Sequence, residues 1–161
     1  MIDLYGNVIK NDVIPEDKII LLDLNYTLIS NSKQCYGAYP KRIYQQKYET
    51  ELLDMIKNNY VILITARPEI FKEETLKHIK KLTGFVPNDS YWNTGYGKQG
   101  MQPHILKEYW LNNAIFDKYG EDPLQYYAIE TNHLTRQMYK KYRIKANKKQ
   151  DIMAKYKWIK M

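Results

Sequence analysis

The sequence predicts an α/β protein with a Rossmann-like, doubly wound parallel sheet. Two apolar runs, residues 19–22 and 61–64, have the length of buried strands, and each ends in polar residues that precede a helical pattern. Residues 126–129 form a third such run. Strands that alternate with helices favour a parallel sheet covered on both faces. Ligands of such sheets bind at the carboxyl ends of the strands, so the polar residues after each run are candidates for a site.

The composition fits one folded domain of 161 residues, because a hydrophobic fraction of 44% suffices for a single packed core. The lone cysteine, Cys35, excludes an internal disulfide framework and fits a reducing compartment, and we expect no functional role for it. The chain has no N-terminal signal pattern and no apolar run near the ~18 residues of a membrane span. These features predict a soluble, cytoplasmic protein.

Turn-forming residues within 1–18 predict an edge hairpin ahead of the first buried strand. Residues 29–40 are polar and predict a loop, which is too short to fold as a separate lid domain. Apolar side chains at helical spacing then predict a helix over residues 42–58. The first third of the chain is therefore expected to contribute one core strand and one helix to the sheet layers.

After the second strand, a helix over residues 68–82 is predicted by Pro68 at its start and Gly84 after its end. Glycines within residues 85–102 predict a loop that contains one brief strand at 91–93. The remaining predicted elements are a helix over 103–119, the strand at 126–129 and a helix before residues 142–144.

The net charge of +7 is concentrated at the C-terminal end. Residues 140–161 contain nine basic residues and one acidic residue, a balance of +8, and the remaining 16 basic and 17 acidic residues give −1. A basic block of this kind can bind phosphate backbones through the release of counterions. It is also typical of a terminal helix with a solvated face. Residues 148–161 are therefore predicted to be a basic tail that contacts nucleic acid or a terminal helix.

Four groups of residues follow the predicted strands or begin a predicted helix. They are Ile-Ile-Leu-Leu-Asp-Leu-Asn-Tyr-Thr-Leu at 19–28, Ile-Thr-Ala-Arg-Pro-Glu at 64–69, Lys107, and Glu-Thr-Asn at 130–132. In order and spacing, these groups resemble the motifs of the haloacid dehalogenase (HAD) superfamily of phosphohydrolases. The resemblance is closest to the phosphatase domain of polynucleotide kinase/3′-phosphatases.

The resemblance implies a single HAD-like domain over residues 1–161, with its core at 19–147 and the basic tail or helix at 148–161. It also implies a minimal cap, because the insertion after the first motif is short. A site with a minimal cap is open to a large substrate, such as a nucleic-acid end or a protein.

The resemblance implies that Asp23 is the nucleophile, which attacks phosphorus and forms an aspartyl-phosphate. It implies that Asp23, the backbone carbonyl of Asn25 and the carboxylate of Glu130 bind Mg²⁺, which neutralises the charge of the phosphate. Asn25 departs from the family, which has Asp there, and Glu130-Thr131-Asn132 stands where the family has two Asp residues. The oxygen donors for the metal are retained. An amide cannot transfer a proton, so we expect Asn25 to slow turnover.

By the same resemblance, the second motif and Lys107 are expected to bind the phosphate group. Thr65 would donate a hydrogen bond to a phosphoryl oxygen, and Ala66 and Arg67 would also contact the substrate. Lys107 would neutralise the transferring group and keep the nucleophile ionised. Lys98, in the glycine-rich loop, is an alternative to Lys107.

Other side chains keep two interpretations. Arg67 can hold a second phosphate or a nucleic-acid backbone as a bidentate donor, or it can form a salt bridge to Glu69 or Glu73. His104 and His133 are candidates for the acid in place of Asn25, and Tyr96 is a candidate stacking platform for a base. Each of these three can also be an ordinary surface, capping or core residue.

We therefore expect a Mg²⁺-dependent phosphatase that hydrolyses a phosphomonoester, with a nucleotide or a nucleic-acid 3′-phosphate as the favoured substrate. The alternative is a catalytically degenerate domain that binds a phosphorylated ligand, nucleic acid or protein without turnover. A third interpretation is a structural partner in a larger nucleotide-repair assembly. The sequence contains no Gly-x-x-x-x-Gly-Lys-Ser/Thr motif, so it cannot transfer phosphate by that route.

Overall fold

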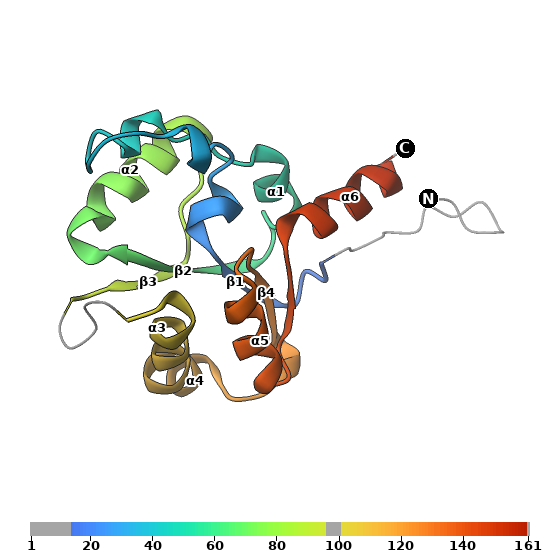
Figure 1. Cartoon of the computed structure of the whole chain (residues 1–161). Helices are drawn as coiled ribbons and strands as arrows, with labels where there is room; N and C mark the ends of the chain where they lie inside the picture. Colours follow the sequence, from blue (N-terminus) through green and yellow to red (C-terminus); the bar gives the residue numbers. More distant parts are fainter. Residues whose placement is uncertain (1–13, 96–100, 161) are drawn as a thin grey trace.

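The computed structural model describes residues 14–95 and 101–160, and this part of the chain contains a sheet of five parallel strands between two layers of helices (Figure 1). From edge to edge the strands are ordered β3-β2-β1-β4-β5. Their bounds are Ile19–Leu22 (β1), Tyr60–Pro68 (β2), Asp89–Asn93 (β3), Tyr126–Ile129 (β4) and Lys145–Asn147 (β5). The predicted α/β class and parallel, Rossmann-like sheet are confirmed.

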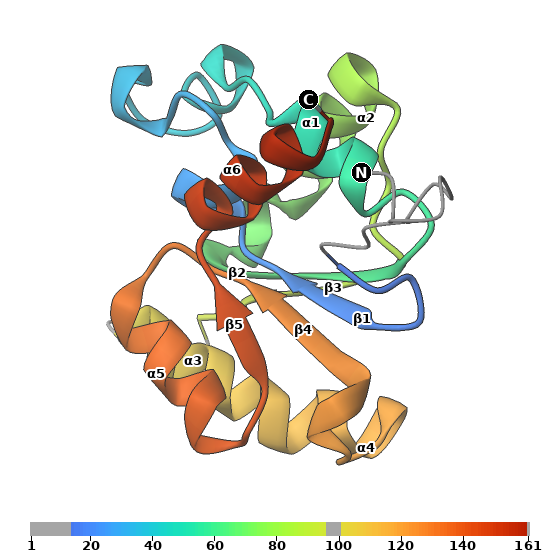
Figure 2. The same ribbon diagram turned by 90° about the vertical axis from the view of Figure 1, so that its right-hand side faces the viewer.

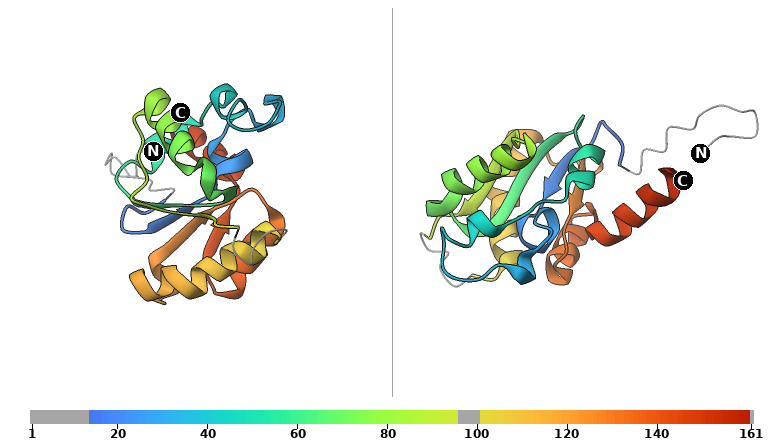
Figure 3. Two further views of the ribbon diagram at one scale, coloured as in Figure 1. Left: turned by 90° about the vertical axis from the view of Figure 1, so that its left-hand side faces the viewer. Right: turned by 90° about the horizontal axis from the view of Figure 1, so that it is seen from above.

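Helices cover both faces of the sheet (Figure 2 and Figure 3). One face carries α1 (Thr50–Met55), α2 (Lys72–Thr83) and α6 (Lys149–Lys160). The other face carries α3 (Pro103–Trp110), α4 (Phe116–Tyr119) and α5 (His133–Lys141). None of the helices within residues 14–95 and 101–160 combines the length and the apolar character that a membrane span requires.

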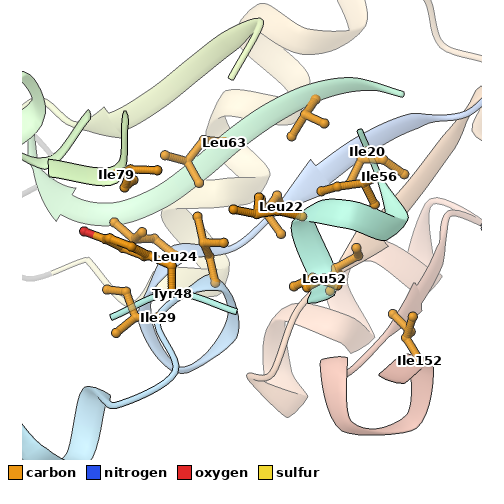
Figure 4. Close-up of a cluster of buried hydrophobic side chains, with 14 of the residues drawn as sticks. Ile20, Leu22, Leu24, Ile29, Tyr48, Leu52, Ile56, Leu63, Ile79 and Ile152 are labelled. Atoms are coloured by element: carbon orange, nitrogen blue, oxygen red, sulfur yellow. The ribbon is translucent and has the colours of Figure 1, made fainter. Parts of the chain in front are cut away.

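Alternate side chains of each strand enter opposite layers, because successive residues of a strand point to opposite faces of the sheet. In β1, Ile20 and Leu22 pack in the cluster under α1, α2 and α6 (Figure 4). Leu21 packs in the cluster on the side of α3 and α5. All three side chains are fully buried. A sheet that is covered on both faces explains why its strands appear in the sequence as unbroken apolar runs.

The strand register brings the polar residues after three strands to one edge of the sheet. Leu22 in β1 pairs with Leu63 in β2 and with Ile129 in β4. Asp23 and Glu130 therefore leave the sheet at the same level, on adjacent strands. The strands β2 and β3 lie on one side of β1, and β4 and β5 lie on the other, so the order in which strands are added switches between β1 and β4. Open α/β sheets bind ligands at such a switch point.

Most of residues 42–58 do not form the predicted helix, so this prediction is wrong for most of its length. Residues Ile43–Gln45 form a 3₁₀ turn, and only Thr50–Met55 forms an α-helix. Between the two, Tyr48 is extended and forms an antiparallel bridge with Ile29. Backbone pairing with the segment after the first motif therefore replaces the helix, although the apolar side chains are still buried.

Three other elements differ from their predicted bounds. Strand β2 extends to Pro68, so the next helix begins only at Lys72, after a 3₁₀ turn, and ends before Gly84 as predicted. Strand β3 begins at Asp89 rather than at residue 91. A strand, β5, follows residues 142–144. The helix predicted over 103–119 is present, with a π-type turn between α3 and α4.

The two chain ends correspond to two further predictions. Most of the edge hairpin predicted within residues 1–18 falls on residues 1–13, which lie outside the described residues. At the other end, the basic segment forms α6, as one of its two interpretations predicts. Ile152 of α6 is only 1% exposed and belongs to the core cluster.

Candidate active site

A cavity of about 380 Å³ opens at the carboxyl edge of the sheet. Its walls come from the segments that follow β1 and β4, from the end of β2 and from the first turns of α3. The lining residues are Asp23, Asn25, Tyr26, Thr65, Ala66, Pro103, Lys107, Glu130, Thr131 and Asn132. The structure thus brings together six of the seven predicted site residues. The seventh, Arg67, lies behind the wall.

Lys107 connects two carboxylates at the bottom of this site. Its Nζ donates to Oδ1 of Asp23 at 2.7 Å and to Oε2 of Glu130 at 2.6 Å. The Lys107 side chain is only 2% exposed. Burial alone would lower the pKa of Lys107, but the negative charges of Asp23 and Glu130 outweigh burial and raise this pKa above its ordinary value. The ammonium group is therefore a fixed positive charge beside Asp23.

The second carboxylate, Glu130, is less well neutralised. Burial and the nearby charge of Asp23 raise the pKa of Glu130 to about 8, although Lys107 and the backbone N–H of Asn132 act in the opposite direction. Two buried carboxylates share one ammonium group here, so the cluster of Asp23, Glu130 and Lys107 carries an excess of negative charge. A proton or a cation bound at these oxygens would neutralise it.

The turn that follows β1 orients the Asp23 carboxylate. The hydroxyl of Thr27 donates to Asp23 Oδ2 at 2.7 Å, and the backbone N–H of Thr131 donates to Thr27 Oγ1 at 3.2 Å. Thr27 is fully buried. The sequence analysis assigned no role to Thr27 or Thr131. The signal for Thr27 was present in the sequence, because Thr27 is the threonine of the first motif.

Thr65 lines the cavity from the end of β2. The backbone N–H of Arg67 donates to Thr65 Oγ1 at 3.1 Å, which leaves the Thr65 O–H free to donate elsewhere. Ala66 lines the cavity beside it. This arrangement provides a hydrogen-bond donor on the wall that adjoins Asp23.

Arg67 does not form a salt bridge to Glu69 or Glu73, which was one of its two interpretations. Its side chain is turned inward and is 2% exposed. Its guanidinium donates to three neutral oxygens: Asn25 Oδ1 at 2.9 Å, Thr75 Oγ1 at 2.9 Å and Gln46 Oε1 at 3.2 Å. The interpretation of Arg67 as an ion-pair partner is therefore wrong. The guanidinium instead fixes the side chain of Asn25.

The Asn25 amide has one orientation that satisfies this contact. Arginine has donors only, so the oxygen of Asn25 must face Arg67, and the amide N–H₂ is left on the side of the cavity. Asn25 can therefore donate a hydrogen bond to a bound group, but it cannot supply or accept a proton in the pH range of catalysis.

Two of the remaining candidates, His104 and His133, do not line the cavity. They lie in the first turns of α3 and α5. Lys98 and Tyr96 lie outside the described residues. Cys35 is buried, and its thiol donates to the carbonyl of Asn31. Within residues 14–95 and 101–160, no three His, Cys, Asp or Glu side chains form a cluster suited to a metal.

No family model matches this sequence, and the curated proteins contain no significant match to it. Among solved structures, the fold is similar to a chain in the "Structure of Pnkp1/Rnl/Hen1 complex", with a TM-score of 0.57 and 19% sequence identity. The similarity covers 82% of this chain and 45% of that chain. This chain therefore spans less than half the length of its structural neighbour. At this level of identity the likeness shows a shared fold.

Proposed function

We propose that this protein is a Mg²⁺-dependent phosphatase of the HAD type, which hydrolyses a phosphomonoester through an aspartyl-phosphate on Asp23. The observation that carries the proposal is the position of Lys107 Nζ, within 2.7 Å of both Asp23 and Glu130, in a cavity at the carboxyl edge of the sheet. A nucleotide or a nucleic-acid 3′-phosphate is the favoured substrate. Its support is the motif resemblance, together with the shared fold of a chain in the Pnkp1/Rnl/Hen1 complex.

In the first step, a carboxylate oxygen of Asp23 attacks phosphorus, and the bond between phosphorus and the ester oxygen breaks. The ester oxygen leaves with the bonding electrons and takes a proton from solvent. Lys107 and the hydroxyl of Thr65 stabilise the charge on the phosphoryl oxygens. In the second step, water attacks phosphorus and loses a proton to solvent, while the bond between phosphorus and the Asp23 oxygen breaks, so phosphate is released and the Asp23 carboxylate is restored. The first step is favoured here because Thr27 and Lys107 hold the Asp23 carboxylate in one orientation.

The oxygen donors at this site suit a hard cation such as Mg²⁺. Asp23, the backbone carbonyl of Asn25 and Glu130 would hold the ion, and the excess negative charge of the two carboxylates favours a cation at this position. When bound, Mg²⁺ would neutralise the phosphate so that an anionic nucleophile can approach it.

One observation favours a second candidate function, a domain that binds a phosphorylated ligand without turnover. The Asn25 side chain occupies the position of the expected acid, and Arg67 holds its oxygen away from the cavity. Without a group that protonates the leaving oxygen and activates water, hydrolysis loses a contribution of roughly 10²–10⁴-fold. Binding of phosphate by Lys107 and Thr65 does not depend on this group.

A phosphatase assay with and without Mg²⁺, across nucleotides and 3′-phosphorylated oligonucleotides, distinguishes the two functions. We expect slow, Mg²⁺-dependent release of phosphate that Asp23→Asn abolishes, because this nearly isosteric change removes the nucleophile. Asp117→Asn, an exposed position on α4, is the matched control and should retain activity. Release of phosphate by the Asp23→Asn protein would contradict the mechanism. Mg²⁺-dependent binding without release would support the second candidate.

A further inference from the structure

Tyr26 has a backbone conformation that side-chain-bearing residues rarely adopt. It lies in the turn after β1 with φ 61° and ψ 0°, in the left-handed region that favours glycine. Hydrogen bonds of its backbone N–H and of its carbonyl hold this conformation. The Tyr26 backbone N–H donates to Ser32 Oγ at 2.9 Å, and its carbonyl accepts from Thr131 Oγ1 at 3.0 Å. A tyrosine thus occupies a position where glycine would be unstrained.

The side chain of Tyr26 adds little to the core that would offset this strain. It is 52% exposed and lines the cavity with Asn25 and Pro103. Among the described residues, no aromatic ring packs on it and no group bonds its hydroxyl. Strained residues of this kind concentrate at ligand sites, where the strain is part of the function.

We infer that the Tyr26 ring is a stacking platform for the base of the substrate, the nucleoside whose phosphate lies against Asp23. This inference rests on the proposed function. The cavity has a charged end, formed by Asp23, Lys107 and Glu130, and an aromatic wall at Tyr26. A ligand that contacts both the charged end and the aromatic wall carries a phosphate and a flat ring a short distance apart. A nucleotide has both groups, whereas a sugar phosphate has no flat ring.

The volume of about 380 Å³ is in the range of roughly 300–1,000 Å³ that is usual for small-molecule sites. Every base has a π face, so stacking on Tyr26 selects nucleosides without selecting their sequence. A free nucleotide and the terminal nucleotide of a nucleic acid share this chemistry. Hydrolysis of a nucleoside 3′-monophosphate and of a 3′-phosphorylated oligonucleotide, measured side by side, identifies the source.

The test compares kcat/KM for a nucleoside 3′-monophosphate with kcat/KM for glycerol 2-phosphate, which has no ring, and uses the ratio of the two. Tyr26→Asn removes the ring but keeps a residue that tolerates the left-handed region, so the protein should fold. This variant should reduce the ratio by about 5- to 150-fold, the value of one stacked base. Tyr26→Phe keeps the ring and should keep the ratio. Tyr36→Asn, at a residue that is 72% exposed, is the matched control.

A ratio that is the same in Tyr26→Asn as in the unaltered protein overturns the inference. If the unaltered protein hydrolyses neither substrate, the proposed function fails, and stacking is then tested by binding. A 3′-phosphorylated dinucleotide that contains 2-aminopurine should lose fluorescence on the unaltered protein and on Tyr26→Phe, but not on Tyr26→Asn. Equal quenching by all three proteins also overturns the inference.

Discussion

At the scale of single residues, the contact between Arg67 and Asn25 fixes the orientation of the amide at the cavity. Arg67 is buried, and all three acceptors of its guanidinium are neutral. Burial lowers the pKa of Arg67, which reflects the cost of a charge without a carboxylate partner. An Asp at position 25 would neutralise this charge and would also restore an acid at the cavity. Asn25 does neither.

Asn25→Asp should therefore raise both stability and the rate of hydrolysis. The new carboxylate replaces the amide oxygen 2.9 Å from Arg67 Nη2, where it gains a charge-assisted hydrogen bond. The restored proton transfer should increase kcat by about 10²–10⁴-fold. Steady-state kinetics and thermal unfolding measure the two effects. Asn113→Asp adds the same charge at an exposed position outside the cavity lining and should give no such increase. A stabilised variant with an unchanged kcat would mean that position 25 is structural.

The sequence predicted Asp23, Thr65 and Lys107 from motifs, because these side chains follow strands or begin a helix at the same edge of the sheet. It could not predict the partners of Arg67. Gln46 follows the 3₁₀ turn at Ile43–Gln45 and Thr75 lies in α2, segments with no motif, and only the fold brings them to the guanidinium. Buried hydrogen bonds from a charged side chain to neutral side chains that are distant in the sequence leave no periodic signal.

At the scale of elements, Asp89 joins the edge strand β3 to α4. Its Oδ2 accepts from the hydroxyl of Tyr119 at 2.6 Å, from the hydroxyl of Tyr91 at 3.0 Å and from Lys118 Nζ at 3.2 Å. Burial raises the pKa of Asp89, but these hydrogen bonds and that of the Ser90 backbone outweigh it, so the pKa lies below its ordinary value of 3.8. The ionised form of Asp89 therefore stabilises this side of the sheet.

The sign of this shift predicts how stability depends on pH. A carboxyl group with a depressed pKa stabilises the fold above its unfolded pKa, and this contribution is lost as pH falls through the folded pKa. Asp89→Asn should lower the free energy of unfolding by about 1–3 kcal/mol at neutral pH. The difference from the unaltered protein should shrink as pH falls below 3.8. Urea unfolding across this pH range measures it, and a constant difference would contradict the assignment. Asp117→Asn, exposed on α4, should show no such dependence.

The elements that the sequence predicted correctly are those with strong apolar patterns. The runs in β1, β2 and β4 are buried on both faces of the sheet, the helix over residues 103–119 has one buried face, and the structure contains all of them. The failure at residues 42–58 has a physical reason. A segment that lies on the core buries apolar residues in any conformation, so Tyr48 can pair with Ile29 and still be buried.

At the scale of the whole molecule, α6 lies in the same helical layer as α1 and α2 (Figure 2). Ile152 packs in the core, and Lys149 is nearly buried, where its Nζ pairs with Glu49 Oε1 at 3.0 Å. The segment that carries the excess basic charge is therefore also a part of the fold. Among the described side chains of residues 148–161, Lys148 and Lys155 are exposed lysines that can contact a phosphate backbone.

Deletion of residues 148–161 and charge reversal within them should therefore have different effects. Deletion removes the buried Ile152 and Lys149 side chains and should lower the melting temperature, so it cannot isolate a binding role. Lys148→Glu with Lys155→Glu should leave the fold intact. If α6 contacts nucleic acid, the double variant should bind a 3′-phosphorylated oligonucleotide more weakly.

The salt dependence of this binding provides the deciding measurement. Loss of two phosphate contacts to a single strand should reduce the slope of log K against log salt concentration by about 1.4. Lys77→Glu with Lys80→Glu, at exposed positions of α2 on the far side of the same layer (Figure 1), is the matched control for net charge. An equal loss of slope in both double variants would indicate a general charge effect. An unchanged slope in the α6 variant would leave this helix as a structural element, and the preference for nucleic acid would then depend on the site around Asp23 alone.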